Sequence, residues 1–168
     1  MSFTNAIRWL NKRKKKGEIR DYVIIGAVAA IAYLETITTQ DLDVIILADT
    51  DEEYFAQYGR LSQAADSIEG MHHVVGGISI QVFPTSGNPL FASALANAKT
   101  VNADGVRTKV ASVEHLVVLA LQSFRLGDQR RIHGLLNEAG PAKVDRLIKE
   151  FDDDDQTLAD RLRSLLRP

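Results

Sequence analysis

The sequence predicts an α+β fold, a mixed β-sheet with flanking helices followed by a helical C-terminal part. Short β-branched runs alternate with helical patterns up to about residue 111, and only helical patterns follow. The 168 residues are 45% hydrophobic and 25% charged, as in an ordinary soluble globular protein. We therefore expect an α/β core over residues 1–111 and a helical part over residues 112–168, packed on the core in one structural domain.

The elements of the core follow from local patterns. Phe3, Ile7 and Leu10 stand at helical spacing, and Gly17 ends that helix. Later glycines indicate two hairpin turns, at residues 76–77 and 103–105. The predicted elements in chain order are helix 3–15, strand 22–25, helix 27–34, strand 42–47, helix 52–68, hairpin 74–83, helix 90–98 and hairpin 100–110.

The C-terminal part reads as helices alone. Ser112 is a suitable N-cap for a helix over residues 113–124, and Pro141 fits the first position of a later helix. The remaining predicted helices cover residues 129–137, 141–151 and 156–166.

Composition excludes several classes of site. The chain has no cysteine, which rules out disulfides, a thiol nucleophile and a cysteine zinc site. The net charge of -2 gives no global basic field for bulk nucleic-acid binding. The longest apolar run, residues 22–34, is shorter than the roughly 20 residues that span a bilayer, and the N-terminus lacks the order of a signal peptide. We expect a cytoplasmic protein with no membrane contact.

Two aspartates stand at the start of the second apolar run. Asp41 and Asp43 are two residues apart, so in a strand their side chains point to the same face. Such a pair suits a hard divalent cation, because Mg²⁺ combines carboxylate oxygens with phosphate oxygens and water. Gly26, where the preceding helix begins, lets a phosphate approach the backbone. The pattern predicts a metal site facing a phosphate cradle.

This combination resembles the nucleotidyltransferase superfamily, whose fold is polymerase-β-like. The family pattern is an apolar residue, Gly, Gly or Ser, a gap, and Asp-x-Asp on the next strand; here it stands as residues 25–27 and 41–43. The segments YVIIGAVAAIAYLETITTQDLDVII and VASVEHLVVLALQSFRLGDQRRI look like motifs of the toxin-type branch, which includes abortive-infection and type IV toxin–antitoxin nucleotidyltransferases. Arg125 and Asp128 match the end of the second motif.

The resemblance implies an activity and a set of site residues. The reaction would transfer a nucleoside monophosphate from a nucleoside triphosphate to RNA, protein or a small molecule, with a possible toxin role and an antitoxin-like protein partner. Asp41 and Asp43 would be catalytic and would bind Mg²⁺ or Mn²⁺. The implied nucleotide-binding residues are Gly26, Ala27, Gln81, Arg125 and Asp128.

The sequence departs from the family pattern at several positions. Ala27 stands where the family has Gly or Ser, Ala120 replaces a common lysine, and Gly127 replaces the lysine before Asp128. The third family carboxylate belongs near residues 79–82, where Gln81 stands, and an amide cannot act as a base. An alternative function is therefore a catalytically degenerate module that binds a nucleotide or a protein without turnover.

Strand alternation predicts where Gln81 points. Ile80 and Val82 share one face and should meet the core, while Ser79, Gln81 and Phe83 share the other. We therefore expect Gln81 to project toward the two aspartates.

Other motifs have simpler explanations. An Asp-x-Asp pair also occurs in solvated turns and in haloacid-dehalogenase-like phosphatases, where Thr usually follows; here Val44 follows. Residues 12–16 suit a solvated helix end or a surface that steers nucleic acid, and residues 152–155 suit a helix N-terminus. His72 and His73 face opposite ways in a strand and cannot easily share one ion, and His115 suits a structural role in its helix.

Overall fold

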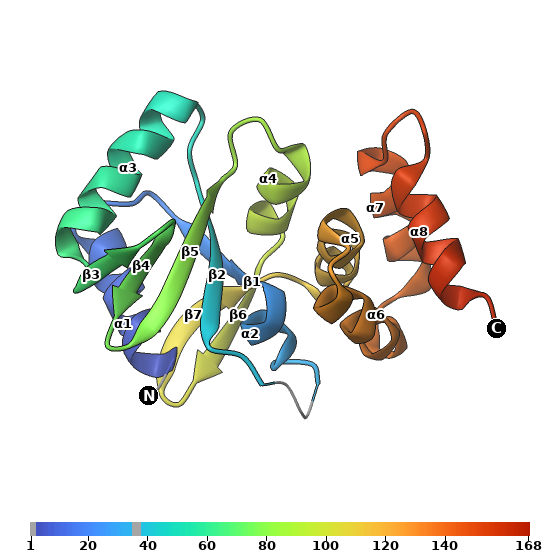
Figure 1. Cartoon of the computed structure of the whole chain (residues 1–168), viewed down its shortest axis with the longest axis horizontal. Coiled ribbons are helices and arrows are strands. Elements are labelled where there is room, and N and C mark those ends of the chain that lie inside the picture. The colour runs from blue at the N-terminus through green and yellow to red at the C-terminus, as the bar shows by residue number, and fades with distance from the viewer. Residues whose placement is uncertain (1–2, 35–37) are drawn as a thin grey trace.

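A computed structural model describes residues 3–34 and 38–168, so Glu35 to Ile37 of the first motif lie outside the described residues. The predicted α+β fold with a mixed sheet is confirmed (Figure 1). The helices are α1 (Phe3–Lys15), α2 (Gly26–Ala30), α3 (Asp51–Ala64), α4 (Pro89–Ala96), α5 (Val113–Ser123), α6 (Leu126–Glu138), α7 (Pro141–Phe151) and α8 (Thr157–Leu166). The strands are β1 (Tyr22–Ile25), β2 (Asp41–Ile46), β3 (Ser67–Glu69), β4 (His72–Val75), β5 (Ile78–Pro84), β6 (Lys99–Ala103) and β7 (Val106–Val110).

The seven strands form one sheet in the order β3-β4-β5-β2-β1-β7-β6. The pairs β2–β5 and β1–β7 are parallel, and the other neighbours are antiparallel. Both predicted hairpins are present, as β4–β5 and β6–β7. This order places β2, which begins at Asp41, at the centre of the sheet between β5 and β1.

The two faces of the sheet differ. Helices α1 and α3 cover one face, where Leu42, Val44 and Ile80 are fully buried. Helix α4 packs over β1 and β2 on the other face, which carries Asp43 and Gln81. The alternation expected for β5 is confirmed, because residues 78, 80 and 82 are buried while residues 79, 81 and 83 are only partly so.

Three helices differ from their predicted bounds by three or more residues at one end. Helix α2 ends at Ala30, four residues early, because the next backbone bonds span three residues and tighten the chain into turns. Helix α3 ends at Ala64 rather than residue 68, because residues 67–69 pair with β4. Helix α6 begins at Leu126, three residues before the predicted start, because the Asp128 carboxylate accepts the backbone N–H of Arg125.

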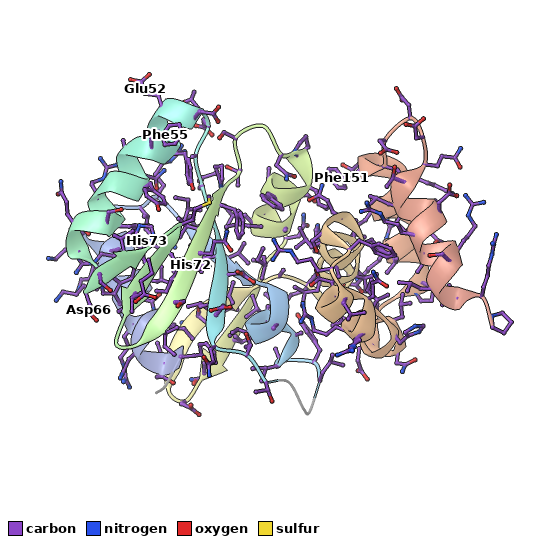
Figure 2. The ribbon with its side chains drawn as sticks, in the orientation of Figure 1. Glu52, Phe55, Asp66, His72, His73 and Phe151 are labelled. Atoms are coloured by element: carbon purple, nitrogen blue, oxygen red, sulfur yellow. The ribbon has the colours of Figure 1, made fainter. Side chains whose placement is uncertain are left out.

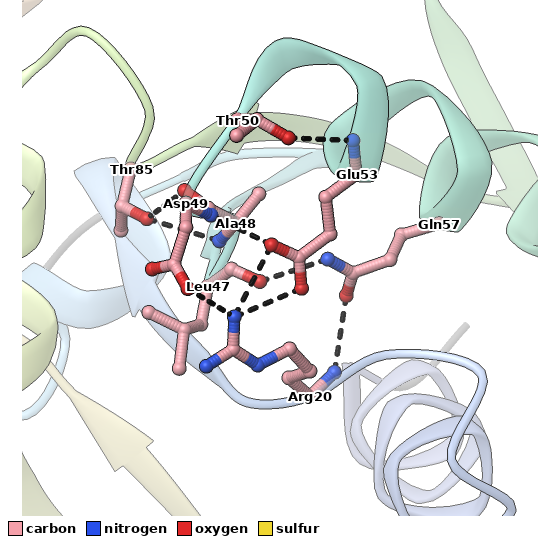
Figure 3. Close-up of polar contacts among 8 residues, drawn as sticks. All are labelled: Arg20, Leu47, Ala48, Asp49, Thr50, Glu53, Gln57 and Thr85. Atoms are coloured by element: carbon pink, nitrogen blue, oxygen red, sulfur yellow. Dashed lines mark hydrogen bonds and ion pairs between the residues drawn. The ribbon is translucent and has the colours of Figure 1, made fainter.

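A polar network holds the far end of β2 (Figure 3). The Arg20 guanidinium donates to Asp49 and Glu53, and the Gln57 side chain bridges the backbone of residues 20 and 47. The Thr85 hydroxyl both accepts from and donates to the backbone of Ala48. The acidic residues after β2 therefore serve to join β1, β2, β5 and α3.

Helices α5 to α8 pack together beside the sheet, on the side away from α3 (Figure 1). Ser112 caps α5 as predicted, since its hydroxyl accepts the backbone N–H of His115. Helix α5 also contacts α2, which brings the helical part to the start of β2. The division at residue 111 stays a prediction. Over the described ranges, none of the helices has the length and apolar character that a membrane crossing requires.

Candidate functional site

The backbone of Gly26 and the carboxylate of Asp43 lie against each other. Gly26 ends β1 and begins α2 with φ +66°, a left-handed conformation that strains any residue with a side chain. A Cβ atom at this position would lie 2.6 Å from Oδ2 of Asp43. Glycine is therefore required twice here, for its backbone angle and for the room it leaves. The close approach follows from the pairing of Ile25 with Asp43 in the β1–β2 ladder.

The two aspartates form an electrostatically coupled pair. Asp41 is exposed at the first position of β2, and Asp43 is partly buried two residues later. Burial raises the pKa of Asp43, and the neighbouring Asp41 carboxylate raises the same pKa further. The two carboxylates thus repel each other when both are ionised, and a cation between them would relieve this repulsion.

A pocket of about 180 Å³ opens beside Asp43 and Gly26. Its walls come from β1, β2 and β5 on the sheet and from α4, α5 and α6. Phe83 and Phe91, whose ring centroids are 6.0 Å apart, form part of its apolar lining. Ala120, at the position where the resemblance leads one to expect lysine, lies in the same wall.

Arginine side chains near the start of α6 bring positive charge to this pocket. Arg125 and Asp128 line it together with Arg131 and Ser123. Asp128 accepts from the Ser123 hydroxyl at 2.6 Å and from the backbone N–H of Arg125 at 3.2 Å, and it forms an ion pair with Arg131. Both arginines act to lower the pKa of Asp43, although burial and Asp41 outweigh them.

Asp128 therefore positions the loop and Arg131, and its part in nucleotide binding stays a prediction. Sequence reasoning missed Arg131 and Ser123. A helix starting at residue 126 would have revealed Arg131, because Asp128 and Arg131 stand one turn apart on it.

The turn that presents Arg125 is held in an uncommon backbone conformation. Phe124 closes α5 with φ 51°, in the left-handed region that a bulky residue seldom adopts. The Gln129 side chain donates to its carbonyl at 2.9 Å, and the Arg161 guanidinium lies 4.9 Å from its ring centroid. Contacts from α6 and α8 thus support the strained turn at the rim of the pocket.

Three predicted residues lie outside the pocket lining. Asp41 stands two residues before Asp43 on β2, and Ala27 is the second residue of α2. Gln81 is the register partner of Asp43 in the parallel β2–β5 ladder, so the two side chains share a face of the sheet. Within residues 3–34 and 38–168, no group of three or more acidic or histidine side chains is placed to hold a metal ion.

The simpler explanations hold for three other motifs. His73 is fully buried and contacts the Ser62 hydroxyl of α3 at 3.0 Å, whereas its neighbour His72 faces the other side of the sheet (Figure 2). Buried His115 joins the hydroxyls of Ser93 and Ser112 and so ties α5 to α4. Asp152 and Asp153 accept the first N–H groups of α8, at residues 157–159.

Comparison with known proteins identifies the fold. Neither a family model nor a curated protein sequence matches the chain. An antigenic nucleotidyltransferase-like protein from Paracoccidioides brasiliensis aligns with a TM-score of 0.70 and 19% identity, over 96% of this chain and 85% of that one.

Two structures of the antibiotic-resistance factor ANT(2'')-Ia are also similar. The solution structure has a TM-score of 0.55 and 14% identity, over 96% of this chain and 95% of that one. The crystal structure with adenylyl-2''-tobramycin has a TM-score of 0.57 and 13% identity, over 87% of this chain and 94% of that one. The chain therefore has the fold of nucleotidyltransferase-like proteins.

Proposed function

We propose that this protein is a metal-dependent nucleotidyltransferase that transfers a nucleoside monophosphate from a nucleoside triphosphate to an acceptor hydroxyl. The observation that carries the proposal is the contact of the Asp43 carboxylate with the Gly26 backbone at the mouth of a pocket that two arginines line. Carboxylates for a cation, an open backbone for phosphates and arginines for phosphate charge together suit this reaction.

The donor set fits Mg²⁺ or Mn²⁺. Asp41 and Asp43 lie on one face of β2, and burial together with the Asp41 carboxylate raises the pKa of Asp43, so a cation at this pair would relieve a real repulsion. Two carboxylates suffice for Mg²⁺, which usually completes its coordination with phosphate oxygens and water. The ion would supply charge neutralisation at the triphosphate and polarise the α-phosphate.

Each remaining residue has a distinct task in this proposal. Gly26 and Ala27 expose the first backbone N–H groups of α2 to the β- and γ-phosphates. Arg125 and Arg131 neutralise phosphate charge at the pocket rim, and Asp128 holds Arg131 in place through its ion pair. Phe83 and Phe91 offer an apolar wall to the nucleoside.

A second candidate is a nucleotide-binding module without turnover. Gln81 favours it, because this neutral side chain is the register partner of Asp43 and cannot remove a proton from an acceptor. The acceptor (RNA, protein or a small molecule), a toxin role and an antitoxin-like partner rest on the sequence resemblance. Both candidates require a nucleotide in the same pocket.

Calorimetry tests the nucleotide site. Titration of each nucleoside triphosphate with Mg²⁺ should show binding to the wild type that requires the metal. Asp43→Asn keeps the size of the side chain and removes its charge, and should weaken binding at least tenfold. The matched control is Asp145→Asn, on an exposed position of α7. Equal affinity in wild type and Asp43→Asn would remove the acidic pair from the site.

Label transfer separates the two candidates. The protein is incubated with triphosphates labelled in the α-phosphate, with Mg²⁺ or Mn²⁺, and with mixed RNA or protein. Transfer of label that Asp43→Asn abolishes supports the enzyme. Metal-dependent nucleotide binding without any pyrophosphate release, including release by transfer to water, supports the nucleotide-binding module.

A further inference from the structure

A row of side chains crosses five strands of the sheet at the level of Asp43. The register pairs Glu69 with His72, His72 with Gln81, Gln81 with Asp43, and Asp43 with Ile25. Register partners in adjacent strands point to the same face. His72, Gln81 and Asp43 therefore share the face on which the candidate site lies, in that order from β4 to β2.

His72 is the titratable side chain nearest to Asp43 along this row on the β5 side. Adjacent strands lie about 4.8 Å apart, so the backbones of β4 and β2 are separated by roughly 10 Å. Gln81 occupies the strand between them. An acceptor hydroxyl that lies over the Gln81 side chain would stand between the aspartates and the imidazole, which it could reach directly or through one water molecule.

The surroundings of His72 leave its imidazole available. The side chain is partly exposed, and in residues 3–34 and 38–168 no hydrogen bond or ion pair engages it. No helix packs extensively over the part of this face that β3 and β4 form, as far as the structure describes it. Its neighbour His73, by contrast, is fully buried and contacts Ser62 and Tyr58 of α3.

The charged and titratable groups around His72 are few. Glu69 is its register partner on β3 and presents a carboxylate from the outer side. His73, on the opposite face of the same strand, is the other titratable group coupled to it. Asp43 lies beyond Gln81. The row thus places a carboxylate on each side of His72.

We propose that His72 is the general base of the transfer reaction, an inference that rests on the proposed function. The acceptor oxygen forms a bond to the α-phosphorus, and the bond from that phosphorus to the bridging oxygen breaks. Pyrophosphate leaves with the electron pair of the broken bond. The hydroxyl proton passes to the imidazole of His72, giving imidazolium, which returns it to water after product release. Histidine suits this task because imidazole titrates near neutral pH.

Water as the acceptor provides a defined test. The rate of pyrophosphate release from ATP with Mg²⁺ is measured for the wild type, His72→Gln and the control His133→Gln, an exposed histidine on α6. His72→Gln should lower the rate by roughly 10²–10⁴-fold, the usual contribution of a general base. It should also remove the rise of rate with pH on the acidic side. His133→Gln should match the wild type.

Binding separates this inference from the proposed function. His72→Gln should bind ATP with Mg²⁺ as tightly as the wild type in calorimetry, whereas Asp43→Asn should not. Unchanged binding in Asp43→Asn contradicts the proposed function itself. Suppose the wild type binds ATP with Mg²⁺ and His72→Gln releases pyrophosphate at the wild-type rate and with the wild-type pH profile. That result overturns only the role of His72. Loss of binding in His72→Gln would make it a binding residue and likewise overturns its role as a base.

Nuclear magnetic resonance supplies a readout without turnover. Addition of a non-hydrolysable ATP analogue with Mg²⁺ should shift the imidazole resonances of His72, because the triphosphate arrives on the same face of the sheet. The resonances of His133 should stay unchanged. If the protein binds the analogue and the His72 signal does not respond, the inference is overturned. It is also overturned if the protein binds the analogue and releases no pyrophosphate from ATP.

Discussion

The two faces of the central sheet carry different kinds of residue although they share every strand. On the face under α1 and α3, Leu42, Val44 and Ile80 are completely buried. On the other face, the positions beside them hold Asp43 and Gln81. His72 and His73 show the contrast within two residues, since one is partly exposed and the other has no accessible surface. The Asp43 face is itself buried farther along β2, at Ile45, so the sheet leaves room for charge on that face at the start of the strand.

Truncation of a side chain on each face of β5 should separate the faces most strongly. Ile80→Ala removes a fully buried side chain and should lower the free energy of unfolding by about 2–5 kcal/mol. Gln81→Ala, one residue away on the open face, should change it by about 0.5 kcal/mol or less. Urea denaturation of both variants measures the difference. Similar losses in the two would show that the open face also carries packing energy.

Gly26→Ala tests the one place where stability and site meet. The left-handed backbone and the Cβ contact with Asp43 should together destabilise the variant by about 1–3 kcal/mol. Gly59→Ala is the matched control, because Gly59 lies in α3 and a Cβ atom there would meet no other group within 4 Å. That change should stabilise the helix by about 0.5–1 kcal/mol. Denaturation curves in which both variants move the same way would contradict this account of Gly26.

Strand alternation accounts for most of what the sequence predicted at the site. The two-residue spacing of Asp41 and Asp43, and the faces of β5, follow from the period of a strand and need no knowledge of the fold. The position of Gln81 beside Asp43 also needed the parallel pairing of β2 with β5, which the family resemblance implied.

Residues that depend on register or on a cap escaped sequence reasoning. His72 joins the row only through the β4–β5 register, and a shift of one residue would have put His73 there instead. Arg131 reaches the pocket because α6 begins three residues earlier than its apolar pattern indicates. Helix α3 ends early because β3 pairs with β4, a long-range competition that local propensity does not report.

Buried His73 should make the fold less stable in acid. Burial holds the pKa of His73 below that of an exposed histidine. The unfolded chain then binds more protons than the folded chain, so the stabilisation is complete above the unfolded pKa and is lost as pH falls through the folded one. Each such group contributes at most about 1.4 kcal/mol per pH unit.

Comparison of His73→Gln with the wild type tests this prediction. Free energies of unfolding between pH 7.5 and 5, each taken relative to the same protein at pH 7.5, should fall less steeply in His73→Gln than in the wild type. Burial also lowers the pKa of His115, so part of the slope should remain in the variant. A wild-type slope in His73→Gln would place its titration outside the folded core.

The smallest predicted effect is a gain of stability at the candidate site. Burial and then Asp41 raise the pKa of Asp43, more than Arg125 and Arg131 lower it. A carboxyl with a raised folded pKa stabilises the fold most at pH values below its unfolded pKa, and this contribution is lost as pH rises through the folded pKa. At neutral pH the ionised Asp43 therefore costs stability, and Asp43→Asn should raise the melting temperature. A gain of about 1 kcal/mol corresponds to a rise of about 2–4 °C for a chain of this size.

Addition of Mg²⁺ with a triphosphate should raise the melting temperature of the wild type and leave that of Asp43→Asn unchanged, since a ligand stabilises only the protein that binds it. A lower melting temperature in Asp43→Asn without ligand would show that Arg125 and Arg131 already compensate this charge and that the ionised carboxylate stabilises the fold.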